Sequence, residues 1–400
     1  MTDVKAPEER PPERPEWMDR ITGVGTSVGR SLLLPTLALI TALIIGAFII
    51  AFSDVDNVPL LFTDTGQALS NMWNEVVAAY SALFRGAVGS VNAISETFYA
   101  ATPLLLAGLG IALGFQAGLF NIGAQGQMFI GGIAAVYVGI YLTAPAIIHI
   151  PLAILAGFLG GMLWGGLAGL LKARTGAHEV ITTIMGNFIA LFLVQWLLTT
   201  EVLQDPGRNN PQSAALAETA QLPRIFGSQY RVTIGFLIAL LAVFAVHWLL
   251  YRSSTGFEFR AVGSNPHAGS YAGMNVAVIV TLAMAVAGGL AGVAGANQVM
   301  GLEPYKATPA LPGSVGFDAI TVALLGRSHP VGVMWAALLF GALIAGGREM
   351  QGAAQVPIDL VVVLQALIVV FVAAPELIRA IWRVKGGAED TKQVTSGWGS

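Results

Sequence analysis

The residues of this sequence that could do chemistry are mostly uncharged amides, and the densest group lies in the stretch AGLFNIGAQGQMFIGG, residues 117–132. Asn121, Gln125 and Gln127 stand there in an otherwise apolar part of the chain. The glycines of the stretch are Gly118, Gly123, Gly126, Gly131 and Gly132. Amide side chains do not ionise, but they donate and accept hydrogen bonds. They therefore suit the brief recognition of a polar, neutral solute better than acid–base or covalent catalysis.

Two interpretations of this stretch stay open from the sequence. Irregular backbone at membrane depth persists only where protein buries it or water lines it. Glycines that loosen a helix around Asn121, Gln125 and Gln127 would fit a solute path. Alternatively, glycines at small-xxx-small spacing let helices approach closely, and asparagine or glutamine then hydrogen-bonds a neighbouring helix.

Further amides and aromatic residues extend the same argument. Asn187 lies in HEVITTIMGNFIA, and Asn297 and Gln298 lie in GLAGVAGANQVMG. Each one alone fits a contact between helices better than a ligand contact. Together they predict a strip of polar side chains, contributed by several spans, that lines the path. Phe115 and Phe120 flank the glycine-rich break and could stack on the face of a base or sugar; a lipid-facing or packing role is their simpler interpretation.

Catalytic and metal-binding patterns are missing from the sequence. It contains no cysteine and no GxxxxGK[ST] phosphate loop, HEVIT at 178–182 is not HExxH, and the five histidines are scattered. We therefore expect no catalytic residue, no metal site and no ATP site in this chain. Glu179, Asp318 and Asp359 lie near the ends of predicted spans, which weakens an ion-coupled secondary transporter without removing it as the alternative.

The elements that must position these residues are membrane helices. The chain of 400 residues is 55% hydrophobic and only 11% charged, whereas soluble domains carry roughly 25% charged residues. No Asp, Glu, Lys or Arg occurs from Thr97 to Leu171, which is room for about three crossings at about 20 residues each. The composition predicts an all-α, polytopic integral membrane protein.

Ten apolar runs are candidate spans, and both chain ends are expected in the cytoplasm. The runs cover residues 32–52, 98–116, 119–143, 150–171, 179–200, 232–251, 274–299, 317–326, 329–347 and 357–375. The break near Gly118 and the short run at 317–326 could each mark a broken or re-entrant segment. This threading divides the chain into a cytoplasmic tail at 1–31, a permease domain at 32–378 and a second cytoplasmic tail at 379–400.

Charge supports this orientation. Six of the twenty basic residues then lie outside, namely Arg85, Arg208, Arg224, Arg231, Lys306 and Arg348, and the other fourteen lie inside, as the positive-inside rule requires. Two long outer connections, 53–97 with an amphipathic stretch and 201–231 with three prolines, are available to a soluble partner; interfacial helices and a plain loop are the alternative.

The inner connection at 251–275, YRSSTGFEFRAVGSNPHAGSYAGMN, predicts a short helix. Asn265 is a good N-cap, Pro266 suits the first helical position, and Gly273 suits the end, so the helix should cover about 266–272. A capped helix of two turns on the membrane surface is a docking element, whereas an ordinary turn is the alternative. Arg260 upstream could anchor the loop, meet an acidic groove of a partner or simply set the topology.

The segment RAVGSNPHAGSYAGMN resembles the one by which permease subunits of ABC importers engage their ATPase subunits. Three further blocks resemble the simple-sugar and nucleoside branch of that family, within the branched-chain amino acid and ribose-type permease superfamily: GLFNIGAQGQMFIGG, KARTGAHEVITTIMGNFIA and GFDAITVALLGRSHPVGVMWAALLFGALIAGG. The blocks run in the family's order from about residue 100 to 350. They are most similar to the longer permease of purine-nucleoside-type importers.

The resemblance implies a permease subunit of an ATP-driven importer in a bacterial-type cytoplasmic membrane. It implies ten spans, a second permease subunit, ATPase domains that hold ATP and Mg²⁺, and an extracytoplasmic solute-binding lipoprotein, with a nucleoside or simple sugar as solute and no nucleic acid as partner. ATPase coupling would belong to Arg260, Gly263, Asn265, Pro266 and Gly273. Gln125 stands where the family commonly has glutamate, which removes a charge from the expected path. A secondary transporter or facilitator for a polar solute remains the alternative.

Overall fold

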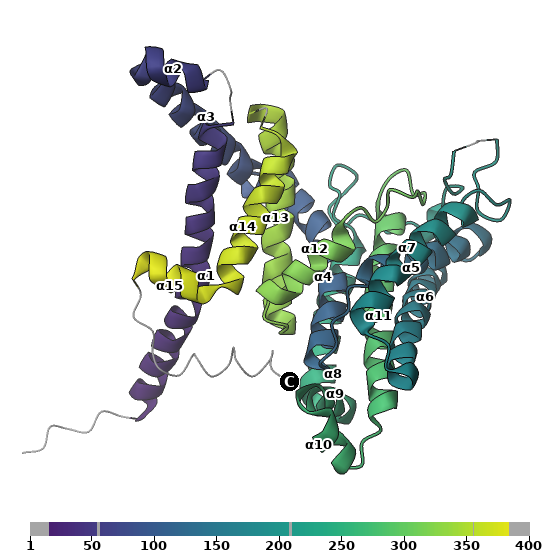
Figure 1. Cartoon of the computed structure of the whole chain (residues 1–400). Coiled ribbons are helices and arrows are strands. Elements are labelled where there is room, and N and C mark those ends of the chain that lie inside the picture. The colour runs from purple at the N-terminus through teal and green to yellow at the C-terminus, as the bar shows by residue number, and fades with distance from the viewer. Residues whose placement is uncertain (1–15, 54–56, 208–209, 355, 384–400) are drawn as a thin grey trace, which may run out of the picture. The chain divides into compact units, whose positions relative to one another are not determined.

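The computed structural model describes residues 16–53, 57–207, 210–354 and 356–383, and these residues are mainly helical (Figure 1). The chain forms two units, Met1–Phe48 with Ala366–Ser400, and Ile49–Gln365. Residues 1–15 and 384–400 of the expected tails, and Arg208, lie outside the described residues. The first described helix begins at Glu16, so residues 16–31 of the expected amino-terminal tail are helical.

The smaller unit contains most of α1 (Glu16–Ala51), the end of α14 (Ile358–Ala373) and all of α15 (Pro375–Trp382). Within it, the indole Nε1 of Trp382 donates a hydrogen bond to Thr41 Oγ1 at 2.9 Å, and Ile378 is fully buried. The described part of α15 is therefore held against α1.

The larger unit contains the remaining elements. In chain order they are α2 (Asn57–Thr63), α3 (Thr65–Val88), α4 (Val91–Gln116), α5 (Ala124–Tyr141), α6 (Ala146–Thr175), α7 (Glu179–Leu197), the short 3-10 helix η1 (Glu218–Ala220), α8 (Ile234–Arg252), α9 (Ser254–Ser264), α10 (Pro266–Tyr271), α11 (Val276–Gly301), α12 (Val315–Leu325), α13 (Pro330–Ala354) and the start of α14.

Six described helices are long and apolar enough to cross a bilayer: α4, α6, α7, α8, α11 and α13. They coincide with six of the ten expected spans. The bent pair α14 and α15 makes a seventh if it counts as one span. The multi-span, all-helical class is confirmed for the described chain.

The four other expected spans also contain helices. The apolar part of α1 covers only Thr36–Ala51, α12 has 11 residues, α14 has 16 and α5 has 18. A crossing takes about 17–25 residues, so the first three are short for one. Helix α5 lies within that range but carries Gln125 and Gln127 in its first turn and is not among the six. The count of ten and the side on which the chain ends lie therefore stay predictions.

The centre of the larger unit is built from glycine contacts among α5, α6 and α11. Gly157, Gly161 and Gly165 recur every four residues on α6 and face Gly288 and Gly292 of α11. A Cβ on Gly161 would lie 2.7 Å from the Cα of Gly292 and closer still to the carbonyl oxygen of Gly288. Without side chains these helices touch along their backbones, which is how membrane helices gain van der Waals packing when no hydrophobic driving force acts between them.

The two long connections differ from each other. Residues 53–97, expected as an amphipathic outer connection, contain α2, α3 and the first residues of α4. Helix α4 begins at Val91, before the predicted 98, because the Ser90 hydroxyl accepts a hydrogen bond from Ala93 N at 3.1 Å and caps the helix there.

Residues 201–231 are mostly irregular but are bound to the segment that follows α11. Ser213 N and Leu216 N donate to the carbonyl oxygens of Ala307 and Tyr305, each at 3.0 Å. Lys306 Nζ pairs with Asp205 at 2.6 Å. Residues 201–231 and the segment that follows α11 therefore form one layer at that end of the larger unit.

Candidate functional site

The predicted break is a real interruption between α4 and α5. Helix α4 ends at Gln116 and α5 begins at Ala124. Gly118 has a φ of +70°, in the left-handed region that favours glycine. Leu119 N donates back to Gly114 O at 2.9 Å, which closes the end of α4 and turns the chain toward α5.

Asn121 and Gln127 form a reciprocal amide pair across the break. Asn121 Nδ2 donates to Gln127 Oε1 at 3.1 Å, and Gln127 Nε2 donates to Asn121 Oδ1 at 3.2 Å. Asn121 Oδ1 also accepts from Gly123 N at 2.9 Å. Both side chains are 1% exposed, so this pair supplies hydrogen bonds to polar groups that could not reach water.

Asn187 and Gln125 connect the break to other helices. From α7, Asn187 Oδ1 accepts from Gly126 N at 2.8 Å, and Asn187 Nδ2 donates to Ile122 O at 2.9 Å. Gln125 Nε2 donates to Gly313 O at 2.5 Å, and Gln125 Oε1 accepts from Gly316 N at 2.9 Å, at the start of α12. These contacts favour the structural interpretation of the four amides; a role in lining the path stays a prediction for them.

The glycines of the break serve different purposes. A Cβ on Gly126 would lie 3.0 Å from the Cα of Asn187, and one on Gly123 would lie 2.9 Å from the Cβ of Thr183, so both positions let α7 approach. Gly132 has only ordinary spacing to α11. Phe115 and Phe120 pack against each other with ring centroids 5.0 Å apart; stacking on a solute stays a prediction for them.

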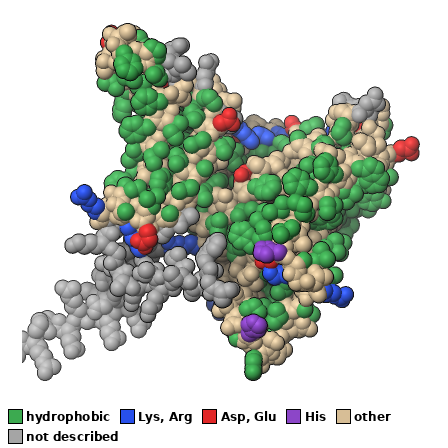
Figure 2. Space-filling model, viewed as in Figure 1, with side chains coloured by type: hydrophobic (Ala, Val, Ile, Leu, Met, Phe, Trp, Pro, Cys, Tyr) green, Lys and Arg blue, Asp and Glu red, His purple; other side chains and the backbone are tan. Residues whose placement is uncertain are grey.

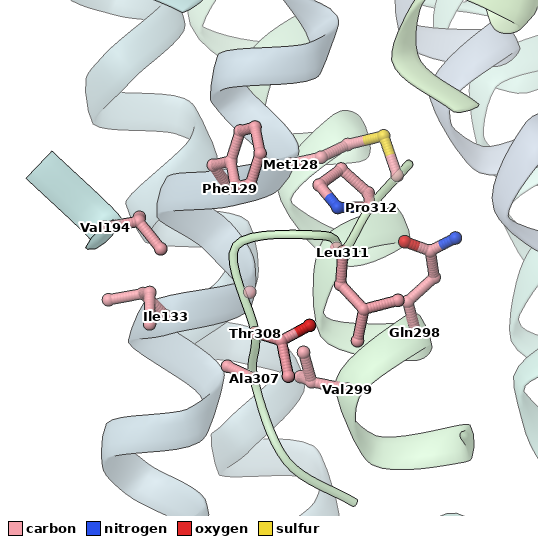
Figure 3. Close-up of a pocket in the computed structure, with 12 residues that line it drawn as sticks. Met128, Phe129, Ile133, Val194, Gln298, Val299, Ala307, Thr308, Leu311 and Pro312 are labelled. Carbon is pink, nitrogen blue, oxygen red and sulfur yellow. The ribbon is translucent and has the colours of Figure 1, made fainter. Parts of the chain in front are cut away.

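Asn297 and Gln298 point to different neighbours although they are adjacent. The Asn297 amide lies against Gly235 at the start of α8. Gln298 lines a cavity of about 10 Å³ together with Met128 and Phe129 of α5 (Figure 3). Its Oε1 is buried without a hydrogen-bond partner among the described residues. The structure thus brings Gln298 to α5 but does not bring Asn297 to the break.

The helix predicted at 266–272 is observed as α10, Pro266–Tyr271. Asn265 Oδ1 accepts from Ala268 N at 3.0 Å, Pro266 is the first helical residue, and Gly273 has a φ of +82°. Tyr271 is 98% exposed. Figure 1 shows α9 and α10 beyond the ends of α8 and α11, where a partner could reach them.

Helix α9 was not predicted from the sequence, and it places Gly263. Its N-cap is Ser253, whose hydroxyl accepts from Gly256 N at 3.0 Å, and it buries Phe259 and Val262. A serine that can cap a helix, Ser253, followed by apolar residues spaced three apart, Phe259 and Val262, is the sequence signal that could have identified α9.

Gly263 lies directly against the break. A Cβ there would lie 2.7 Å from Gly118 N and closer to the carbonyl oxygen of Gln116. Gln116 Nε2 in turn donates to Ser328 O at 3.2 Å, in the turn between α12 and α13. We call this meeting of α9 with Gln116–Gly118 the junction.

Aromatic and basic side chains surround the junction. The guanidinium of Arg260 lies 5.2 Å from the ring centroid of Tyr251, and the rings of Tyr251 and His329 are 5.4 Å apart. Burial, and secondly the neighbouring His247, lower the pKa of His329, so its imidazole is neutral at pH 7. Arg260 thus packs on an aromatic surface next to Gly263 instead of extending freely into solvent.

Gln125→Glu should make stability depend on pH. Only a protonated carboxyl can replace the amide N–H that reaches Gly313 O, because an ionised one presents lone pairs to that carbonyl. We therefore expect the variant to lose thermal stability relative to wild type as the pH rises from 5 to 8, by up to about 1–3 kcal/mol. Thermal unfolding of the assembled complex would measure the difference. Gln125→Met, which lacks both hydrogen bonds at every pH, is the control; a pH-independent deficit in both variants would contradict the prediction.

Comparison with known proteins gives consistent matches. Residues 93–373 match the family described as branched-chain amino acid transport system / permease component. The chain is 39% identical, over 88% of its length and 95% of the relative's, to the guanosine ABC transporter permease protein NupP of Bacillus subtilis (strain 168). It is 34% identical to the glucose ABC transporter permease protein TsgB13 of Haloferax volcanii, over 78% of this chain and 84% of the relative. It is 31% identical to the nucleoside ABC transporter permease protein NupB of Lactococcus lactis subsp. cremoris, over 88% of this chain and 93% of the relative. No solved structure matches the chain significantly.

Proposed function

Because this chain belongs to the family of branched-chain amino acid transport system permease components, we propose that it forms the translocation path of an ATP-driven ABC importer. The solute is a nucleoside or a related sugar-containing molecule, as the names of the relatives suggest. The amides expected to line the path are uncharged, and the chain from Thr97 to Leu171 carries no charged residue. A neutral path suits an uncharged polar solute, because charges at membrane depth are costly and demand counter-ions.

The junction is the single observation that carries this proposal. An exposed, capped helix α10 continues through α9 into a backbone contact with the break, at Gly263 and Gly118. A force applied to α10 by a partner would therefore reach the interruption between α4 and α5 without passing through a flexible linker. A facilitator that works without ATPase subunits has no use for such a connection.

The proposed partners follow from this arrangement. ATPase subunits, which hold ATP and Mg²⁺, would dock on α10 and move it on nucleotide binding. A second permease subunit would complete the path, and an extracytoplasmic solute-binding lipoprotein would deliver the solute at the layer formed by residues 201–231. The assembly would lie in a bacterial-type cytoplasmic membrane.

Reconstitution would test the proposal. The chain is placed in proteoliposomes with its second permease, ATPase and binding protein, and uptake of radiolabelled guanosine and glucose is measured with ATP, with ADP and without the ATPase. We expect uptake of at least one solute only with ATP and the complete set. Equal uptake by the chain without ATPase would instead establish the facilitator alternative.

A further inference from the structure

A second cavity, of about 170 Å³, lies between the break, α6 and α7. We call it the lateral cavity. It is lined by Gly123 and Gln127, by four residues of α6 including Trp164, and by four residues of α7 including Thr182 and Gly186. Only Gln127 of these was expected in the path from the sequence. The cavity lies at the same end of the helices as the junction, since Gly123 belongs to the break and packs against Thr183 near the start of α7.

The lining combines an aromatic wall with a few polar groups. Trp164 provides the aromatic wall, and its Nε1 is 3.5 Å from where a Cβ on Gly186 would stand. Thr182 provides a hydroxyl oxygen that can still accept a hydrogen bond, because its proton is directed to the carbonyl oxygens of its own helix. Small-molecule sites typically have this composition, mostly apolar walls with a few placed polar groups.

The size of the cavity indicates a partial site. Sites for drug-sized ligands occupy roughly 300–1,000 Å³, so the lateral cavity can hold only part of a nucleoside. Its outer side is formed by side chains that are themselves exposed, among them Leu167 (54%) and Ile189 (59%). Hydrophobic side chains cover the surface of α6 and α7 in Figure 2. A neighbouring subunit seated on this surface would close the cavity.

We propose that the lateral cavity holds the base of a nucleoside in transit, stacked on Trp164. This inference rests on the proposed function and narrows its solute class from sugars to nucleosides. An acyl chain of a lipid is the competing occupant. The indole N–H of Trp164 and the hydroxyl of Thr182 would gain nothing from an acyl chain, whereas a base offers donors and acceptors to these polar groups and a π face to the indole.

Filling the cavity at Gly186 tests the proposal. Gly186→Leu should lower ATP-driven guanosine uptake at least tenfold in the reconstituted complex, because the new side chain occupies the space of the base. Gly186→Ala, whose Cβ would meet only Trp164 Nε1 at an ordinary 3.5 Å, should stay within about threefold of wild type. Gly352→Leu, at an exposed position with nothing within 4 Å, is the control for leucine in a helix. Wild-type uptake by an assembled Gly186→Leu complex would overturn the proposal.

A chemical probe tests the occupant without transport. The chain has no cysteine, so Thr182→Cys introduces one thiol, and its reaction with a small methanethiosulfonate reagent can be followed from the mass of this chain in the two-permease complex. Guanosine should slow the reaction at least fivefold and glucose should not, while Ser228→Cys, in an exposed loop, should react equally under all conditions.

The outcomes separate this inference from the proposed function. Protection by both solutes or by neither would overturn the assignment of a base to the cavity, even if ATP-driven uptake is observed. Protection by guanosine without ATP-driven uptake would instead overturn the importer while supporting the cavity. Slower labelling only in lipid bilayers, relative to detergent, would assign the cavity to an acyl chain.

Discussion

Gly161→Leu should prevent this chain from accumulating as a folded membrane protein. The backbone of α6 touches that of α11 at this position, and any Cβ would overlap Gly288 O and approach Gly292 N to 2.8 Å. Neither atom can move without separating the two helices. The contact is reciprocal, because a Cβ on Gly292 would lie 2.9 Å from the Cα of Gly161. Overpacking a core costs about 1–3 kcal/mol when side chains can adjust, and here only backbone is available to adjust.

A graded series on the same helix measures this effect. Gly161→Ala should reduce folded protein and lower the melting temperature, although alanine is favoured over glycine in a helix by about 1 kcal/mol. Gly166→Ala gains the same propensity but meets Ala285 Cβ at an ordinary 3.4 Å, so it should be neutral or stabilising. Fluorescence-detected size exclusion gives the yield and the thermal stability. Equal behaviour of the two alanine variants would show that α6 and α11 are not in backbone contact.

Local rules were sufficient to predict helix α10. Asn265, Pro266 and Gly273 act on the few residues beside them, through a cap, a fixed φ and a left-handed end. Their positions therefore predicted α10 to within one residue. The break near Gly118 was predicted for the same reason, because a glycine-rich stretch weakens a helix wherever it occurs.

The partners of the amides could not be predicted, because they come from distant parts of the chain. Gln125 bonds residues 313 and 316, and Asn187 reaches back to Ile122 and Gly126. Residue type predicted that these amides would find partners, but only the packing of α7 and α12 on the break determines which ones. The junction between Gly118 and Gly263 was missed for the same reason.

Helix geometry explains the outcome for the pair at 297–298. Successive residues of an α-helix point about 100° apart, since one turn takes 3.6 residues. Asn297 therefore meets α8 while Gln298 faces α5. The two adjacent amides therefore face different helices, and a role for either of them in lining the path stays a prediction.

Gly263→Val should separate ATP hydrolysis from solute uptake. A valine there forces α9 away from Gln116 and Gly118, since the atoms it would meet belong to the backbone of the break. Helix α10 keeps its own cap, in which Asn265 Oδ1 accepts from Ala268 N, so the ATPase still meets a folded α10. We expect the complex to assemble and to hydrolyse ATP, with uptake per ATP lowered at least tenfold. Adding Asn265→Ala, which removes a cap worth about 1 kcal/mol, should lower it further by fraying the six-residue α10.

Ser264→Val distinguishes the junction from a general effect of valine on α9. It adds the same β-branched side chain to the adjacent residue, which is exposed, and should leave uptake per ATP within about twofold of wild type. Both quantities are measured on one reconstituted preparation, as solute-stimulated phosphate release and as radiolabelled uptake. If Gly263→Val assembles and transports with the wild-type ratio, movement of α10 does not reach the break through Gly263. If hydrolysis and uptake instead fall together in that variant, α9 is needed to bind or activate the ATPase, and transmission to the break must occur through another contact.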